Sequence, residues 1–131
     1  MNNTVSVTCA VIVKNDTVLA CQRGPNSEHP YEWEFPGGKI EEGETPEQCI
    51  VREIWEELNV DIEIIKPLHE IVFKYPEKSV RLIPFLCSLT KGNPTPIEHH
   101  TIRWQLKSRM VDLTWSEADE KLICLNSSEF K

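Results

Sequence analysis

The sequence predicts a mixed α/β domain, because strand-like runs rich in valine and isoleucine alternate with two segments that carry helix signals. One helical segment follows a capping signal in the middle of the chain, and the other lies near the C-terminus. The chain has 131 residues, of which 40% are hydrophobic and 27% charged. We therefore expect one globular domain over residues 1–131, with enough chain to bury a core.

The first elements expected are two strands joined by a turn. Residues 5–13 alternate weakly and are rich in valine, residues 15–16 are the turn pair Asn-Asp, and residues 17–22 form the second strand. Residues 24–31 contain two prolines and a glycine and are expected to form a loop. The Pro-Gly-Gly stretch at residues 36–38 is interpreted as a further break.

A helix is predicted over residues 46–58. Thr45 is a suitable N-cap, Pro46 suits the first helical position, and Gln48 completes a capping box. Asn59 tolerates the left-handed conformation that ends many helices. On a wheel of about 100° per residue, one arc is apolar and expected to be buried. Its members are Ile50, Val51, Ile54, Trp55 and Leu58.

The second half of the chain is expected to add strands and a final helix. Strand-like runs occupy residues 60–65, 68–75 and 80–89, and a loop with two prolines covers residues 91–99. Residues 102–106 are expected to form a short strand. Residues 116–125 fit a C-terminal helix with Ser116 as its N-cap.

Charge and cysteine content exclude several classes of protein. There are 21 acidic and 14 basic residues, a formal net charge of −7, which argues against a nucleic acid polymer or an anionic membrane as partner. The longest apolar run, residues 9–13, is too short to span a bilayer, and the N-terminus lacks the pattern of a signal peptide. The five cysteines form no C-x-x-C pair. We expect reduced, mostly buried cysteines in a cytoplasmic protein.

Three glutamates form a compact cluster on the predicted central helix. Glu53, Glu56 and Glu57 share an arc separate from the apolar one, with Arg52 beside them. Like charges at this spacing destabilise a helix, although a solvated acidic face tolerates them. Carboxylate oxygens also suit hard cations such as Mg²⁺ or Mn²⁺. Cys49 falls near these acids, and its small side chain is expected to let residues 37–38 pack close to the helix.

The segment from Gly38 to Val60 reads G-x5-E-x7-R-E-I-x-E-E-x-N-V. It closely resembles the Nudix box, G-x5-E-x7-R-E-U-x-E-E-x-G-U, in which U is aliphatic. Asn59 replaces the last glycine and can adopt the same backbone conformation. The resemblance implies the Nudix α/β/α sandwich with a mixed β-sheet and a metal-dependent hydrolase.

The resemblance also implies roles for the box residues. Glu53 and Glu57 are expected to be the first ligands of Mg²⁺ or Mn²⁺, with Glu56 and the backbone carbonyl of Gly37 completing the site. Arg52 is expected to orient these carboxylates. The remaining box acid, Glu44, is expected to be structural or to lie behind the metal ligands without binding the ion. A negative charge at its position, a helix N-terminus, is favoured in any case.

The resemblance extends beyond the box to the small MutT-type nucleoside triphosphate pyrophosphohydrolases. The run EWEFPGGKIEEGETPEQ at residues 32–48 carries it, together with Arg23 as a substrate contact on the preceding strand. The implied reaction is attack of water on a nucleoside triphosphate, which releases a monophosphate and pyrophosphate. In such relatives the reaction serves nucleotide-pool sanitation and DNA repair.

A second acidic element, Glu98-x5-Trp104, matches the MutT pattern late in the chain. There Glu98 is expected to bind a metal ion or to deprotonate the attacking water, with a plain loop acid as the alternative. Whether Glu98 or a box glutamate is the general base stays open. His99 and His100 are expected to be exposed loop residues without a role.

Three further residues are candidates for substrate contacts. Lys39 is expected to meet a phosphate and Tyr75 to line the pocket, although a solvated lysine and a core tyrosine are the alternatives. Asp119 matches the position that reads the base in these relatives. The spacing Ser116-x-x-Asp119 also suits a helix cap, so that role is the alternative for Asp119.

The expected partner is a small nucleotide. The substrate is an oxidised purine nucleotide such as 8-oxo-dGTP or, alternatively, CTP, dCTP or 5-methyl-dCTP. A different class, a Nudix regulator that binds a nucleotide without cleaving it, is disfavoured because every acid of the box is present. The protein is expected to be a monomer or a homodimer, and the number of metal ions stays open.

Overall fold

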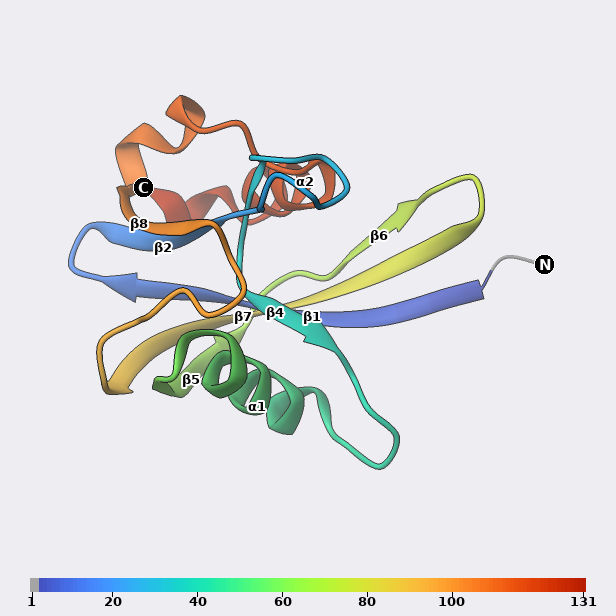
Figure 1. Ribbon diagram of the computed structural model, residues 1–131, viewed down its shortest axis with the longest axis horizontal. Coiled ribbons are helices and arrows are strands. Elements are labelled where there is room, and N and C mark those ends of the chain that lie inside the picture. The colour runs from blue at the N-terminus through green and yellow to red at the C-terminus, as the bar shows by residue number, and fades with distance from the viewer. Residues whose placement is uncertain (1–2) are drawn as a thin grey trace.

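The computed structural model describes residues 3–131 as a mixed eight-stranded sheet with helices on both sides (Figure 1). Met1 and Asn2, which belong to the expected domain, lie outside the described residues. Over residues 3–131, no helix is both long enough and apolar enough to cross a bilayer.

The elements follow one another in the order β-β-β-β-α-β-β-β-β-α, with two 3₁₀ helices, η1 and η2, near the C-terminus. Their bounds are β1 Asn3–Lys14, β2 Thr17–Gln22, β3 Trp33–Glu34, β4 Gly37–Lys39, α1 Pro46–Leu58, β5 Asp61–Pro67, β6 Ile71–Lys74, β7 Lys78–Lys91, β8 Thr101–Leu106, η1 Lys107–Asp112, α2 Glu117–Leu125 and η2 Ser127–Phe130.

Strand β1 is the centre of the sheet. It runs parallel to β7 from the pair Asn3–Lys78 to the pair Val13–Ser88, and antiparallel to β2 and β4. The main path is β3-β2-β1-β7-β5, with β6 paired to β7 and β8 paired to β2. This combination of parallel and antiparallel pairs confirms the mixed sheet expected from the sequence.

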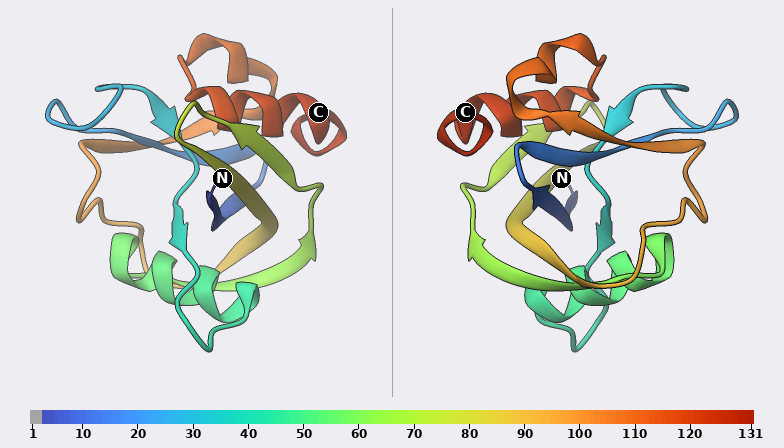
Figure 2. Two further views of the ribbon diagram at one scale, coloured as in Figure 1. Left: turned by 90° about the vertical axis from the view of Figure 1, so that its right-hand side faces the viewer. Right: turned by 90° about the vertical axis from the view of Figure 1, so that its left-hand side faces the viewer.

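The two faces of the sheet are covered by different helices, because alternate residues of a strand point to opposite sides. Ile12 of β1 packs in one apolar cluster with Ile54 of α1, and Val11 packs in another with Leu122 of α2. Two views from opposite sides place α1 on one side of the strands and α2 with the 3₁₀ helices on the other (Figure 2). The α/β/α sandwich is therefore confirmed.

The predicted start and end of the central helix are also confirmed. The amide of Gln48 donates to Thr45 Oγ1 at 3.1 Å, and the amide of Thr45 donates to Gln48 Oε1 at 3.0 Å. This capping box satisfies two amides that the helix itself leaves without partners. Asn59 ends the helix in the left-handed conformation, with φ of 57° and ψ of 39°.

The buried face of α1 differs from the predicted one. Val51 and Trp55 were expected to be buried, but they are 40% and 53% exposed. Cys49 and Glu57 are buried in their place. Strand β4 packs on the side of the helix that carries Cys49 and Glu57, so these two residues are covered.

The short strands β3 and β4 were not predicted. The sequence indicated a break at residues 36–38, yet Gly37–Lys39 pairs with Val7–Cys9 of β1. Glycine and proline normally weaken a strand, so the pairing depends on tertiary contacts with β1 and α1. The 3₁₀ helices η1 and η2 were not predicted either.

Cys49 fills the space between α1 and β4. Its Sγ lies 3.2 Å from Thr8 Oγ1, 3.5 Å from the carbonyl oxygen of Gly38 and 3.4 Å from that of Lys39. All five cysteines are free, and all but Cys124 are buried, as expected. The small side chain of Cys49 therefore allows β4 to lie close to the helix.

Two glycines make this close approach possible. A Cβ atom on Gly37 would lie 2.0 Å from the backbone oxygen of Thr8, which cannot move without distorting β1. A Cβ atom on Gly38 would lie 2.3 to 2.6 Å from the carboxylate atoms of Glu53, the mobile end of a side chain. The first glycine is required by the sheet, and the second leaves room for one acidic group.

We predict that Gly37→Ala and Gly38→Ala affect stability unequally. Gly37→Ala should lower the free energy of unfolding by about 1 to 3 kcal/mol or more, because it overpacks two backbone segments. Gly38→Ala should cost less than about 1 kcal/mol, because the Glu53 side chain can swing away. Urea denaturation followed by circular dichroism measures both values. Equal losses in the two variants would show that the backbone around Gly37 yields more readily than its contacts indicate.

Candidate active site

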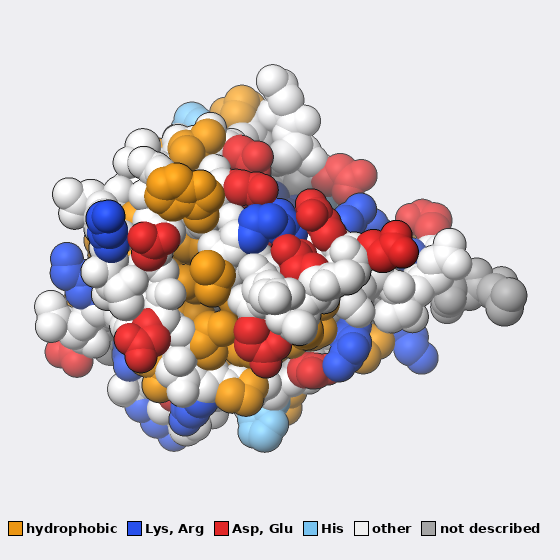
Figure 3. All heavy atoms as spheres, turned by 90° about the horizontal axis from the view of Figure 1, so that it is seen from below, with side chains coloured by type: hydrophobic (Ala, Val, Ile, Leu, Met, Phe, Trp, Pro, Cys, Tyr) orange, Lys and Arg blue, Asp and Glu red, His pale blue; other side chains and the backbone are white. Residues whose placement is uncertain are grey.

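Arg52 lies among the acidic side chains of the box. Its Nε and Nη2 donate to the two carboxylate oxygens of Glu44 at 2.7 and 2.9 Å. Its Nη1 donates to Glu53 Oε1 at 2.9 Å and to Glu56 Oε2 at 3.1 Å. The space-filling view from the α1 side shows acidic side chains gathered beside basic ones (Figure 3). One guanidinium thus balances three neighbouring carboxylates.

The pairing of Glu44 with Arg52 is the strongest in this group. Hydrogen bonds from Arg52, and then the amide of Glu41 at 3.0 Å, lower the pKa of Glu44 to about 2. The same bonds with Glu44 raise the pKa of Arg52. Glu44 is therefore ionised throughout the neutral range, and its two oxygens hold the guanidinium in a fixed plane. Its position is that of a support for Arg52.

Glu57 points into the protein, beneath β4. It is 7% exposed, and its Oε2 accepts a hydrogen bond from the amide of Gly37 at 3.1 Å. Burial, followed by the charge of Glu53, raises the pKa of Glu57 to about 9. Glu34 and Glu98 also contribute to this increase. The expectation that the acids lie away from the packed face is wrong for Glu57.

A polar cavity of about 490 Å³ opens beside Glu57. Glu98 lines the cavity together with Arg23, Glu34 and His99. The loop that carries Glu98 is attached to the end of α1, since the amide of Ile97 donates to the carbonyl oxygen of Glu57 at 3.1 Å. Glu98 itself is exposed. The structure thus brings this late acid to the same cavity as the box acid Glu57.

The expectation that His99 is an exposed loop residue is wrong. Its side chain is 7% exposed, and its Nε2 lies 2.9 Å from Glu34 Oε2. His100 is exposed and makes an edge contact with Tyr31, with ring centroids 5.4 Å apart. The two adjacent histidines therefore differ in burial and in their contacts, because only the side chain of His99 turns toward the sheet.

Glu34 connects His99 to Arg23. Its Oε1 accepts a hydrogen bond from Arg23 Nε at 2.6 Å, while its Oε2 faces His99. Burial alone would raise the pKa of Glu34, but the hydrogen bonds with His99 and Arg23 outweigh it and lower the pKa. Glu34 is therefore a carboxylate that accepts a hydrogen bond on each side.

A second cavity of about 580 Å³ adjoins the first, and both are lined by Arg23 and Glu34. Its other walls include Phe35, Tyr75 and Asp119. Phe35 is buried and stacks on Trp115 at 4.8 Å, so one aromatic wall is rigid. Tyr75 is half-buried and follows β6. The sequence-predicted residues Arg23, Tyr75 and Asp119 therefore meet in one cavity.

Asp119 is buried in the first turn of α2. Its carboxyl group accepts a hydrogen bond from the hydroxyl of Ser116. Burial raises the pKa of Asp119 to about 7, although the bond from Ser116 opposes the shift. Ser116 occupies the predicted N-cap position, but its hydroxyl does not cap a backbone amide of α2. The expected side-chain cap is replaced by this pair.

The remaining candidates do not line either cavity. Glu56 has a 52% exposed side chain and contacts Arg52. Lys39 is exposed on β4, and its carbonyl oxygen accepts from Arg52 Nη2 at 3.3 Å. Sequence reasoning missed Glu34 and Phe35, although both belong to the run at residues 32–48 that carries the wider resemblance.

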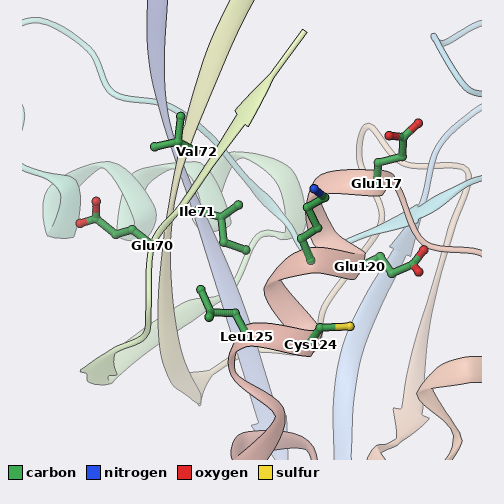
Figure 4. Close-up of a pocket in the computed structure, with 8 residues that line it drawn as sticks. Glu70, Ile71, Val72, Glu117, Glu120, Cys124 and Leu125 are labelled. Atoms are coloured by element: carbon green, nitrogen blue, oxygen red, sulfur yellow. The ribbon is translucent and has the colours of Figure 1, made fainter.

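A larger groove of about 760 Å³ lies elsewhere, between β6 and α2. Figure 4 shows Glu70, Ile71 and Val72 on one side and residues of α2 on the other. Glu70 lies on the β6 side, whereas Glu117 and Glu120 lie on α2 together with Lys121, so the acids do not converge on one point. The groove therefore lacks the arrangement that a phosphorylated substrate and a cation require.

The chemistry of the box acids suits a divalent cation. Across residues 3–131, no three His, Cys, Asp or Glu side chains already form a closed metal site. Instead, Arg52 holds Glu53 and Glu56, and the amide of Gly37 holds Glu57. All of these groups present oxygen atoms, which are the preferred ligands of hard cations. Burial and then the neighbouring acids raise the pKa of Glu57, and a cation among these groups would offset the part that is due to the acids.

The comparisons with known proteins agree with this site. A family model described as the NUDIX domain matches residues 2–125. The 8-oxo-dGTP diphosphatase of Proteus vulgaris is 37% identical over 82 residues, which cover 63% of this chain and 73% of the relative. The 8-oxo-dGTP diphosphatase of Escherichia coli strain K12 is 31% identical over 91 residues, which cover 70% of each chain.

A solved structure supports the same assignment over nearly the full length. The solution structure of the DNA mismatch repair protein MutT, a Nudix hydrolase from methicillin-resistant Staphylococcus aureus 252, is 32% identical. It superimposes with a TM-score of 0.79 and covers 98% of this chain and 99% of its own. The chain therefore belongs to the Nudix family and is a MutT-type hydrolase, an enzyme that acts on phosphorus-containing anhydrides.

Proposed function

We propose that the enzyme hydrolyses an oxidised purine nucleoside triphosphate, of which 8-oxo-dGTP is the representative, to the monophosphate and pyrophosphate. The relatives named above are 8-oxo-dGTP diphosphatases, and this name supports the substrate class. The reaction is the attack of water on a phosphorus atom of the triphosphate. It requires no covalent intermediate, so the cysteines have no part in it.

The observation that carries this proposal is the pair of adjoining cavities. Glu57 and Glu98 line the polar one, and Phe35 and Asp119 line the other. A nucleotide has a charged triphosphate and an aromatic base. The polar cavity suits the triphosphate with its cation, and the cavity beside Phe35 suits the base. Arg23, at their junction, is positioned to meet the phosphate or sugar between them.

We assign the divalent cation to the acids around β4. Glu53, Glu56 and Glu57 of the box and the carbonyl oxygen of Gly37 are its ligands in this proposal, and Mg²⁺ or Mn²⁺ is the ion. Such an ion lowers the pKa of water and stabilises negative charge on phosphoryl oxygens. Without it, the acidic cavity would repel a triphosphate.

The protein groups have separate tasks around this ion. Glu44 holds the guanidinium of Arg52 in a fixed plane, and Arg52 donates hydrogen bonds to Glu53 and Glu56. In this proposal Arg52 orients these two carboxylates. Glu98 lies on an exposed loop, where solvent water can reach it. Within the described chain, Glu98 makes no ion pair that would occupy its oxygens. It is therefore suited to accept a proton from the attacking water.

Asp119 is proposed to read the edge of the base, with Phe35 and Tyr75 beside the ring. A pKa of about 7 means that both forms of the carboxyl group are populated near neutral pH. The ionised form accepts hydrogen bonds, and the protonated form also donates one. This suits an oxidised purine, whose edge presents both donors and acceptors. A contact between Lys39 and a phosphate stays a prediction.

We predict that Glu53→Gln and Glu57→Gln each lower kcat by several orders of magnitude, because a neutral amide is a poor ligand for a hard cation. Activity should require Mg²⁺ or Mn²⁺ and disappear with EDTA. Steady-state hydrolysis of 8-oxo-dGTP, followed by released pyrophosphate, measures both effects.

The control is the stability of the metal-free proteins. Glu57→Gln should be at least as stable as the parent, because the buried carboxyl group of Glu57, with a pKa of about 9, is already uncharged near neutral pH and the amide oxygen of glutamine still accepts from Gly37. A variant that folds normally and retains the parental kcat would remove that glutamate from the metal site.

We predict that Asp119→Asn changes the preference among bases. Loss of one buried hydrogen bond costs about 1 to 3 kcal/mol, which corresponds to roughly tenfold to a hundredfold in kcat/KM. Asp119→Ala should show this loss for the preferred base, whereas Asp119→Asn should shift preference toward 8-oxo-dGTP relative to CTP. The measurement is the ratio of kcat/KM for the two substrates. An unchanged ratio with a lower Tm would assign Asp119 to helix stability alone.

The pH dependence of stability provides a separate control on the buried carboxyl group. Asp119 has an ordinary pKa of 3.8 and a folded-state pKa of about 7. The folded protein therefore binds more protons between these values, and the wild type loses stability as pH rises through them. Relative to the wild type, Asp119→Asn should gain about 1.4 kcal/mol per pH unit in that window. A flat difference would show that Asp119 is already ionised at pH 4.

A further inference from the structure

We propose that His99 is a positioning residue for the hydrolytic reaction, because its contact with Glu34 holds the loop that carries Glu98 opposite Glu57. The inference rests on the role given to Glu98 in the proposed function. It concerns a residue of this chain for which the Nudix box and the wider MutT pattern provide no role.

The loop is anchored to the rest of the protein on both sides of Glu98. Before it, the amides of Thr95 and Ile97 donate to the carbonyl oxygens of Leu58 and Glu57 at 3.0 and 3.1 Å. These carbonyls belong to the last turn of α1, whose oxygens have no partners within the helix. The helix that carries the box acids therefore also fixes the start of the loop.

The second anchor follows directly after His99. The amide of His100 donates to the carbonyl oxygen of Gln22, the last residue of β2, at 2.9 Å. Glu98 and His99 therefore span the gap between α1 and β2. Within this short bridge, the imidazole of His99 is the side chain that turns inward and reaches the sheet.

The contact that His99 makes is specific. Because Glu34 is a carboxylate, His99 donates its Nε2 hydrogen to Glu34 Oε2 at 2.9 Å. Glu34 in turn is fixed by Arg23 at 2.6 Å and by the pairing of β3 with β2. His99 is thus attached to a rigid part of the sheet, and the loop cannot swing away from the polar cavity without breaking this bond.

The other nitrogen of the ring shows that packing does not explain the position of His99 by itself. Within residues 3–131, Nδ1 is buried and has no hydrogen-bond partner. Burial of a nitrogen without a hydrogen-bond partner costs free energy. The bond from Nε2 to Glu34 therefore helps to keep the ring inside. A side chain that supplied only the Nε2 donor would therefore serve as well.

The test uses three groups of variants. His99→Leu removes the donor and keeps similar bulk, and His99→Gln places an amide nitrogen near the position of Nε2. His100→Ala is the matched control, because this neighbouring histidine is exposed and does not contact Glu34. Glu98→Gln, alone and combined with His99→Leu, shows whether the two residues act together.

We expect His99→Leu to lower kcat by about tenfold to a hundredfold, because a small displacement of a reacting group has effects of this size. KM for the nucleotide should change by less than about twofold, because Arg23 keeps its bond to Glu34. His99→Gln should recover most of the lost kcat, and His100→Ala should match the wild type. In the Glu98→Gln background, His99→Leu should have no further effect.

A second readout does not depend on activity. In the metal-free protein, His99→Leu should accelerate amide hydrogen exchange at Ile97 and His100 by about tenfold or more, while amides of β1 keep their protection. NMR measures each amide separately. This experiment reports on the loop itself, whatever the role of Glu98.

The outcomes separate the two proposals. Wild-type kcat in Glu98→Gln would refute the role of Glu98, and the exchange rates would still decide whether His99 holds the loop. The proposal for His99 is overturned if exchange at Ile97 and His100 is unchanged in His99→Leu. It is also overturned if His99→Gln is as impaired as His99→Leu, or if the losses in kcat from Glu98→Gln and His99→Leu multiply.

Discussion

The repulsion among carboxylates that must lie side by side is the constraint on which the rest of the site depends. The box presents Glu53, Glu56 and Glu57 on neighbouring turns of one helix, where like charges oppose folding. Arg52 offsets part of this repulsion by binding Glu53 and Glu56, and Glu44 fixes the guanidinium. Glu57 is not held by Arg52, and its pKa of about 9 reflects burial beside other acids. The site thus contains more acidic groups than Arg52 can balance, and a bound cation would neutralise the remaining negative charge.

The packing of α1 against β4 turns this constraint into a site. Gly38 allows the carboxylate of Glu53 to lie against the strand, and Gly37 gives Glu57 its hydrogen-bond donor. At the C-terminal end of the helix, the carbonyl oxygens of Glu57 and Leu58 accept hydrogen bonds from the loop that carries Glu98. One helix therefore positions acids from two distant parts of the chain. The junction at Arg23 and Glu34 then joins this acidic cavity to the one that contains Asp119.

The sequence was sufficient where a feature depends on local signals. The capping box at Thr45 and the end of α1 at Asn59 are local, and the spacing of the box acids places them on one helix. The prediction failed where tertiary contacts override local preference. Strand β4 consists of Gly37–Lys39, a stretch that reads as a break, and its contact with α1 covers Glu57, an acid expected to lie away from the packed face. His99 reads as an exposed loop residue because its partner, Glu34, lies 65 positions away in the sequence.

The most direct test of the central claim is the free energy of unfolding as a function of Mg²⁺ concentration, in the wild type and in Glu57→Gln. If the crowded acids are a cation site, Mg²⁺ binds the folded state and stabilises it by about 1.4 kcal/mol for each tenfold increase above the dissociation constant. Urea denaturation at constant ionic strength isolates this effect from general screening. The account predicts that the wild type gains stability with Mg²⁺ and that Glu57→Gln gains much less. Equal curves for the two proteins, or no gain in the wild type, would contradict it.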